Sequence, residues 1–503
     1  MDGPTQNKNK RRLARALLVT VAAFALNSCA GLYHQQYRAG DHSHVTRPDY
    51  DLFFVESDDE GWFWEAGQAD RALDAITHSA AVQDTIVVTF VHGWHHSSQC
   101  CDSNIEGFKE VLRQLRVELS KEMYSSARQQ IHGGRDSGPI QIIGVYVGWR
   151  GRSLPGLLDY VTFWGRKSSA ERVGDSDFQE FMIRLKNAYE DHAAPPAQPA
   201  PPTDPKLFGL ITIGHSFGGQ AVLRATSSFL EHRLADSNRS GRGYLHVPPQ
   251  PGSGVPLAQP LQGFGDLIVL VNPAVEAAAY QRIHSLSQQL TYGTDQTPVM
   301  LTLSADNDVP RDRFFRLGRI AGEWFTGKPR KADPRERRME RQALGFNAEQ
   351  VTHRLAPADE ASKLHATTLH STPDPGCKGS DHCDFEWYEW SNAATLTAPP
   401  DSVSADANAR DLAAVAKITL HDYSSCTVLG GVELCPEAGA IPNQAFIVAT
   451  VDRQLIDGHN GIFSGPLMRF LTRYIGLVEA KKFLPRVASG APSQQSEKQG
   501  ADR

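Results

Sequence analysis

The stretch LFGLITIGHSFGGQAVLRA, residues 207–225, reads as a strand, a sharp turn and a helix. Its first half is apolar and β-branched, which is typical of a buried strand, and its second half favours a helix. Ser216 stands between them in a G-x-S-x-G pattern, which exposes a serine at the tip of a tight turn. Small residues are needed around that serine because strand and helix nearly touch. Three glycines meet this need: Gly214, Gly218 and Gly219. The stretch therefore predicts a nucleophilic serine at the carboxyl end of a strand.

Composition narrows the classes of function. The chain has 503 residues, of which 40% are hydrophobic and 21% charged, and its formal net charge is −6. This length allows more than one folded unit. The negative charge argues against a nucleic-acid-binding surface. The sequence has no P-loop, no dinucleotide-binding fingerprint and no H-E-x-x-H zinc signature. We therefore expect no cofactor and no nucleic-acid partner.

The N-terminus has the pattern of an export signal. Basic residues precede a short apolar stretch at 16–26, which is too short to span a bilayer. The stretch ends in Leu26-Asn27-Ser28-Cys29, which resembles a bacterial lipobox, although Asn27 departs from the usual small apolar residue. We expect cleavage before Cys29 and its lipidation. Because Ala30 rather than Asp follows, the expected location is the outer membrane of a bacterial envelope, facing the periplasm. Ordinary secretion and an uncleaved anchor are the alternatives.

The remaining cysteines fit an exported protein. Six are left after Cys29, an even number that predicts disulfides in an oxidising compartment. Short spacing favours two local bridges, Cys377–Cys383 and Cys426–Cys435. Cys100 and Cys101 then form a vicinal bridge or stay as thiols.

Strand and helix patterns alternate along the chain. Expected strands are 52–56, 86–91, 140–147, 207–213, 267–271, 299–303 and 444–451. Expected helices are 69–79, 105–121, 178–189 and 465–474. This alternation predicts an α/β fold, a mainly parallel sheet with helices on both faces, and reactive groups at the carboxyl ends of the strands. A polar segment, 311–443, is expected to be an insertion before the last strand, either a cap that contacts substrate or a small satellite unit with its own core. It contains an aromatic cluster: Phe385, Trp387, Tyr388 and Trp390.

A serine hydroxyl needs a general base, and that base needs an acid to orient it. The sequence DNDVP follows the strand at 299–303 and offers Asp306 as the preferred acid, with Asp308 as the alternate. Both could instead form a turn or cap a helix. His459 follows the last strand in a glycine-containing loop and is the expected base, with His421 as its main competitor.

Two backbone N–H groups are expected to stabilise the negative charge that develops during acyl transfer. One belongs to Phe217, directly after Ser216. The other is expected from the strand-end sequence Val91-His92-Gly93-Trp94, where Gly93 allows close approach and Trp94 offers its N–H. Histidines and cysteines lie close by and permit a zinc alternative: His92, His95, His96, Cys100 and Cys101. Because the oxyanion loop already explains His-Gly, no metal is expected.

With these residues in place, the chain resembles the α/β-hydrolase superfamily, particularly its esterase-like and lipase-like members. The resemblance covers residues 50 to 310 and 444 to 480. FVHGW at 90–94, YVGWRG at 146–151 and NPA at 272–274 are similar to motifs of bacterial hydrolases in that superfamily. The resemblance implies a Ser216–His459–Asp306 triad and hydrolysis of an ester or related acyl bond, without implying a particular substrate.

These inferences divide the chain into six expected segments. They are a signal peptide (1–28), a linker (29–49), a first core segment (50–310), the insertion (311–443), a last core segment (444–484) and a disordered tail (485–503). The expected function is that of a serine hydrolase acting on a small-molecule or lipid ester. A non-catalytic envelope lipoprotein on the same scaffold, and an amidase or peptidase with the same triad, are the alternatives.

Overall fold

A computed structural model describes most of the chain between residues 33 and 488. The main described ranges are 33–121, 138–154, 162–193, 206–240, 260–293, 296–308, 333–358 and 426–488. Short stretches and single positions between them are also described, including Tyr124, Arg128, Asp159 and Arg311. Cys29, Cys377, Cys383, His421, the four aromatic residues of the insertion and the tail from 489 lie outside the described residues.

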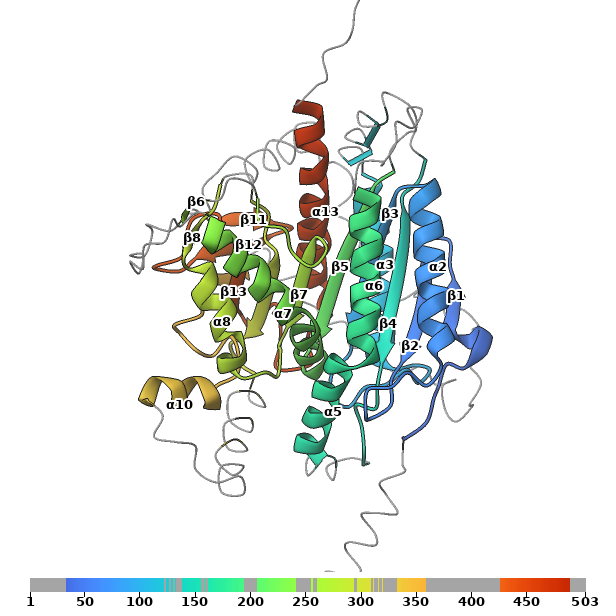
Figure 1. The fold of residues 1–503 in the computed structure, drawn as a ribbon, viewed down its shortest axis with the longest axis horizontal. Helices are drawn as coiled ribbons and strands as arrows, with labels where there is room; N and C mark the ends of the chain where they lie inside the picture. The colour runs from blue at the N-terminus through green and yellow to red at the C-terminus, as the bar shows by residue number, and fades with distance from the viewer. Residues whose placement is uncertain are drawn as a thin grey trace, which may run out of the picture.

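Within the described residues, one eleven-stranded sheet runs through the molecule in the order β1-β2-β4-β3-β5-β7-β9-β13-β10-β12-β11 (Figure 1). Its strands are β1 His44–Thr46, β2 Asp51–Glu56, β3 Thr85–Val91, β4 Gln141–Gly148, β5 Phe208–His215, β7 Leu267–Val271, β9 Met300–Ala305, β10 His353–Pro357, β11 Thr427–Leu429, β12 Val432–Pro436 and β13 Phe446–Val451. The strands from β2 to β10 pair in parallel, whereas β1, β11 and β12 pair antiparallel. The expected α/β fold with a mainly parallel sheet is confirmed.

Helices cover both faces of this sheet (Figure 1). They are α2 Ala66–Val82, α3 Ser103–Leu119, α5 Phe163–Asp175, α6 Asp177–Ala193, α7 Phe217–Ser240, α8 Ala277–Ser287, α10 Pro334–Arg341 and α13 Gly465–Ala488. One core lies between the sheet and α2, α6, α7 and α8, and the other lies between the sheet and α3 and α13. Helix α3 illustrates the cause: Asp102 caps its first turn, and Ile105, Phe108 and Leu112 recur at helical spacing and are buried.

The segment 311–443 differs from the expected insertion. Its described parts 353–357 and 427–436 form β10, β11 and β12, which continue the same sheet beyond β13. The expectation that the whole segment stands outside the sheet is therefore wrong for these strands. They are short and half-exposed, so their apolar pattern is weaker than that of the fully buried central strands.

Smaller differences occur at both ends of the chain. The expected linker 29–49 contains β1, which pairs with β2 through Val45 and Leu52. Helix α13 runs to Ala488, so the helix extends past the expected start of the tail at 485.

A separate two-stranded sheet joins β6, Val255–Pro256, to β8, Leu290–Thr291. Among the described helices, none combines the length and the apolar character that crossing a bilayer requires.

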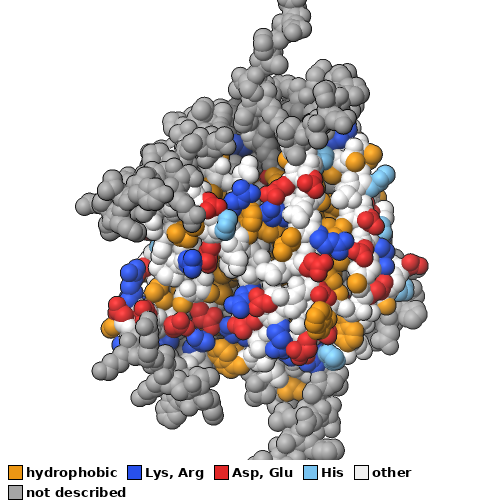
Figure 2. Space-filling view, in the orientation of Figure 1, with side chains coloured by type: hydrophobic (Ala, Val, Ile, Leu, Met, Phe, Trp, Pro, Cys, Tyr) orange, Lys and Arg blue, Asp and Glu red, His pale blue; other side chains and the backbone are white. Residues whose placement is uncertain are grey.

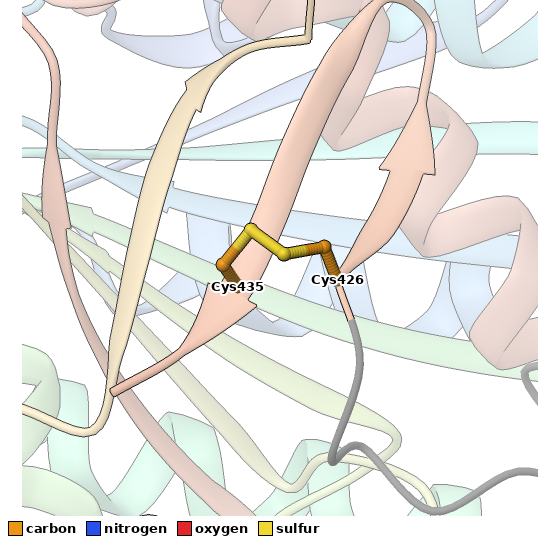
Figure 3. The surroundings of a disulfide bond; sticks show 2 residues. All are labelled: Cys426 and Cys435. Carbon is orange, nitrogen blue, oxygen red and sulfur yellow. A yellow bond between two sulfur atoms is a disulfide. The ribbon is translucent and has the colours of Figure 1, made fainter. Parts of the chain in front are cut away.

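Cys426 and Cys435 form the expected local disulfide across the β11–β12 hairpin (Figure 3). Cys100 and Cys101 are each disulfide-bonded, which excludes the expectation that they stay as thiols.

On the face shown in Figure 2, acidic and basic side chains are intermingled rather than gathered into a patch of one charge.

Candidate active site

The strand β5 passes into helix α7 through the predicted sharp turn at Ser216. The serine has φ +56°, a left-handed conformation that is uncommon for a residue with a side chain. A Cβ on Gly218 would lie 2.0 Å from the carbonyl oxygen of Val91, and one on Gly214 would lie 2.7 Å from Cα of Gly219. Strand, turn and helix therefore pack so closely that glycine is required on both sides of the serine. The strained backbone holds Ser216 at the carboxyl edge of the sheet.

Three side chains from distant parts of the sequence meet at this turn. Ser216 Oγ lies 2.7 Å from His459 Nε2, and His459 Nδ1 lies 2.7 Å from Asp308 Oδ2. His459 comes from the loop between β13 and α13, and Asp308 from the turn after β9. Because β5, β9 and β13 are parallel, their carboxyl ends lie at the same edge of the sheet. The side chains of Ser216 and Asp308 are buried, and the His459 side chain is 14% exposed.

The carboxylate that contacts His459 belongs to Asp308, so the preference for Asp306 is corrected. Asp306 is the first residue after β9, its backbone N–H donates to the Val451 carbonyl, and the residue is exposed. Burial and the nearby charge of Asp452 raise the pKa of Asp306, whereas Arg354 opposes them. Two residues later the turn directs Asp308 inward. The expectation of a carboxylate in DNDVP is thus met by the alternate residue.

The charge state of Asp308 fixes the proton positions on His459. Burial by itself would raise the pKa of Asp308, but the positive charge and hydrogen bond of His459, together with Arg311, lower it. An ionised carboxylate only accepts hydrogen bonds, so His459 Nδ1 must donate to it. In the neutral imidazole, Nε2 then carries the lone pair and faces the hydroxyl of Ser216. This is the tautomer that can remove a proton from the serine.

Backbone carbonyls of the histidine loop are held by buried polar side chains. Asn272 Nδ2 donates to the carbonyl of His459 at 2.9 Å and to that of Gly458 at 3.2 Å. His215 Nε2 lies 3.1 Å from the same His459 carbonyl and must therefore carry its hydrogen. Burial lowers the pKa of His215 well below its usual value, so His215 is neutral. Asn307 Oδ1 adds a bond from the N–H of Gly458 at 3.0 Å. The loop is fixed before any ligand binds.

A buried arginine lies behind the carboxylate. The guanidinium of Arg311 is 3.4 Å from Asp308 Oδ2, 3.1 Å from Asn272 Oδ1 and 3.0 Å from Ser304 Oγ. It also donates to the Leu344 carbonyl. The backbone N–H of Arg311 donates to Asp308 Oδ1 at 3.1 Å. Asp308 is therefore bonded on both oxygens, and Asn272 links the arginine to the histidine loop. The sequence analysis missed Arg311, because a lone arginine after a turn carries no recognisable pattern.

The loop after β3 lies directly beside the serine. A Cβ on Gly93 would come within 2.7 Å of Ser216 Cβ and 3.0 Å of the His215 ring. Phe217 is the first residue of α7, and the first N–H groups of a helix have no acceptor within it. The partial positive charge of that helix end falls next to Ser216 Oγ. The expected neighbours Gly93, Trp94 and Phe217 are thus brought to the serine, and the rings of Trp94 and Phe217 lie 6.3 Å apart.

Neighbouring histidines each have polar partners within the protein. His92 Nε2 accepts from the Trp149 N–H at 3.0 Å, which leaves Nδ1 to donate to the Gly93 carbonyl. His96 contacts Asp102 and Asn104. His95 Nδ1 lies 2.8 Å from Asp159 Oδ2. Burial opposes ionisation of Asp159, but the hydrogen bonds from His95 and the backbone lower its pKa to about 2. Each of these imidazoles is therefore engaged in polar contacts within the protein.

No protein-family model, curated protein or solved structure matches the chain. The chemistry of the site therefore has to be argued from its own geometry. The Ser216 hydroxyl, the His459 imidazole and the ionised Asp308 carboxylate are hydrogen-bonded one to the next, with a helix N-terminus and a glycine loop beside the hydroxyl. Such an arrangement can activate the serine as a nucleophile and can receive a developing oxyanion.

Proposed function

We propose that this protein is a serine hydrolase of the α/β-hydrolase superfamily that cleaves a carboxylic ester or related acyl bond. The observation that carries the proposal is the pair of 2.7 Å contacts that link Ser216 Oγ through His459 to Asp308. The chain order serine, acid, histidine and the positions at strand ends agree with that superfamily. The positive φ of Ser216 also fits, since such strain persists where the surrounding structure enforces it.

Catalysis proceeds in two steps. His459 Nε2 removes the hydroxyl proton while Ser216 Oγ attacks the substrate carbonyl, and the carbonyl oxygen becomes an oxyanion held by the N–H groups of Phe217 and Trp94. The same imidazole then returns the proton to the leaving alcohol as the C–O bond breaks, which leaves an acyl-serine. Water, deprotonated by His459, then attacks the acyl-serine, and His459 returns that proton to Ser216 Oγ as the acyl C–O bond breaks and the acid leaves. Asp308 stabilises the imidazolium in both steps.

The test uses the purified mature protein and its Ser216→Ala variant on short p-nitrophenyl esters. We expect hydrolysis by the native chain and loss of the enzymatic rate in the variant. A fluorophosphonate probe should label the native chain on Ser216. If both proteins hydrolyse the esters equally, Ser216 is not the nucleophile. Absence of both labelling and turnover would favour the non-catalytic lipoprotein, and a panel of ester, thioester and amide substrates would separate an esterase from an amidase.

We further propose that the mature chain begins at Cys29 and is anchored by lipid in the outer membrane, facing the periplasm. Support comes from the basic and apolar pattern before Leu26-Asn27-Ser28-Cys29. The disulfide between Cys426 and Cys435 fits an oxidising compartment. Mass spectrometry of the N-terminal peptide tests the anchor, because acylation adds the mass of a diacylglyceryl group and an acyl chain to Cys29.

A further inference from the structure

Two neighbouring tryptophans project from the carboxyl edge of the sheet. Trp62 is 64% exposed and Trp64 is 39% exposed, whereas Phe63 between them packs against the core. This alternation follows from the extended backbone, since Phe63 forms a β-bridge with Ser57 just after β2. Two large aromatic side chains on one side of one segment are unlike the scattered exposed apolar residues of ordinary protein surfaces.

The segment is held rigidly at that edge. Asp58 Oδ1 accepts hydrogen bonds from the N–H groups of Glu60 and Trp62, both at 2.9 Å, and the Trp62 carbonyl accepts from Asp58 N–H. Phe63 N–H donates to Asp177 at the start of α6. The tryptophans are thus presented in a fixed geometry, so binding would not have to order the backbone of this segment.

Acidic residues surround the tryptophans, but their charges are balanced. Asp59 pairs with Arg150 and Arg166. Glu60 pairs with Arg172 at 3.2 Å, and Glu65 with Arg71 at 2.9 Å. The segment therefore has little net charge, and a binding partner would be attracted to it by the aromatic rings rather than by electrostatics.

Aromatic rings at the start of α5 pack against residues of the candidate active site. Trp164, 38% exposed, lies at the start of α5, the helix whose Arg166 pairs with Asp59. The adjacent Phe163 ring lies 5.0 Å from Phe217 and 5.1 Å from Trp94, and both of these residues flank Ser216. The exposed tryptophans and Ser216 therefore lie at the same edge of the sheet, because Trp62 and Trp64 follow β2 and Ser216 follows β5.

The beginning of the described chain indicates what covers the tryptophans. The His34 ring lies 5.2 Å from the Trp64 ring. Cys29 is five residues before His34, a distance that a fully extended chain spans in at most about 18 Å. A lipid on Cys29 would keep the His34 backbone within about that distance of the bilayer, with the Trp64 ring beside the His34 ring. Tryptophan rings prefer the boundary between lipid headgroups and acyl chains, because they combine an apolar body with a polar N–H.

We propose that Trp62 and Trp64 insert into the headgroup region of the bilayer that holds the Cys29 lipid, and so turn the carboxyl edge of the sheet, with Ser216, toward the membrane. This inference rests on the proposed lipid anchor but not on the hydrolase activity. The lipid surface would then also be the source of acyl substrates for the proposed reaction.

The test measures tryptophan fluorescence of the lipidated full-length mature protein in phosphatidylcholine vesicles, with bromine either absent or placed near the headgroup end of the acyl chains. We expect brominated lipid to reduce emission of the native protein, and the reduction to be largely absent in Trp62→Ala/Trp64→Ala. Val117→Ala is the matched control, because Val117 is 53% exposed in the last turn of α3, which lies toward the opposite edge of the sheet. Its reduction should equal that of the native protein.

Two further measurements complete the test. Ser216→Ala should be quenched like the native protein, which separates docking from catalysis. Thermal unfolding should be the same for the double variant, because both side chains are exposed. Equal quenching in the native and double-variant proteins would overturn the proposal, as would an N-terminal peptide without lipid or docking that appears only when a second protein is added.

Discussion

Under the proposed mechanism, replacement of Asp308 by asparagine should abolish most of the esterase rate, because the Arg311 N–H orients the new amide. The backbone N–H of Arg311 donates to Asp308 Oδ1, so the amide oxygen must take that position. The NH₂ group then faces His459 Nδ1 and donates to it. The imidazole is forced to carry its proton on Nε2, where it can no longer accept the proton of Ser216.

The magnitude follows from this change of tautomer. The equivalent substitution in a serine triad lowers kcat about 10⁴-fold, which corresponds to about 5 kcal/mol of transition-state stabilisation. The Arg311 guanidinium, 3.4 Å from Asp308 Oδ2, opposes the new NH₂ group because both are donors. We therefore expect a loss of about this size in kcat on p-nitrophenyl esters, with little change in KM.

Asp306→Asn is the matched control. Asp306 lies two residues away on the same turn, is exposed and has no role in the hydrogen-bonded series. Its rate should stay within about threefold of native, as for other surface substitutions. Both variants should be checked for folding by thermal unfolding. A fully active Asp308→Asn protein, or an inactive but folded Asp306→Asn protein, would refute the assignment of the acid.

Three further predictions concern packing, positioning and pH. Gly218→Ala should lower the unfolding free energy in urea by at least about 3 kcal/mol, since its Cβ would stand 2.0 Å from the Val91 carbonyl oxygen; native stability would contradict the tight turn. Asn272→Ala should lower kcat about 10²-fold without unfolding the protein, because it frees the His459 loop; an unchanged kcat would remove Asn272 from a positioning role. Burial lowers the pKa of His92 to about 4, so the unfolded chain binds a proton at this histidine more readily than the folded protein does. The free energy of unfolding is therefore highest above about pH 6.5, decreases as the pH falls, and levels off below about pH 4. Across that pH range, the free energy of unfolding measured in urea should decrease by up to about 3 kcal/mol because of His92, and by less in His92→Asn. The same dependence on pH in both proteins would exclude this role of His92.

Local patterns were sufficient for the central sheet. The strands at 86–91 and 267–271 were predicted within one residue because continuous β-branched runs have few alternatives. Helix α5 was not predicted, because it is polar and only weakly periodic. The edge strands β10 to β12 were also missed. They are short, and their half-exposed sequences resemble loops until neighbouring strands supply their hydrogen bonds.

The sequence by itself determined the sharp turn at Ser216 and the order along the chain of the serine, the carboxylate and the histidine. These depend on local demands: glycine beside Ser216, and loops that directly follow strands. Only the tertiary structure decided which carboxylate serves the histidine. Asp306 and Asp308 follow the same strand, and what separates them is the direction in which the turn points each side chain. That direction is set by Arg311 and by the packing of β9 against β13, and these contacts leave no pattern in a single sequence.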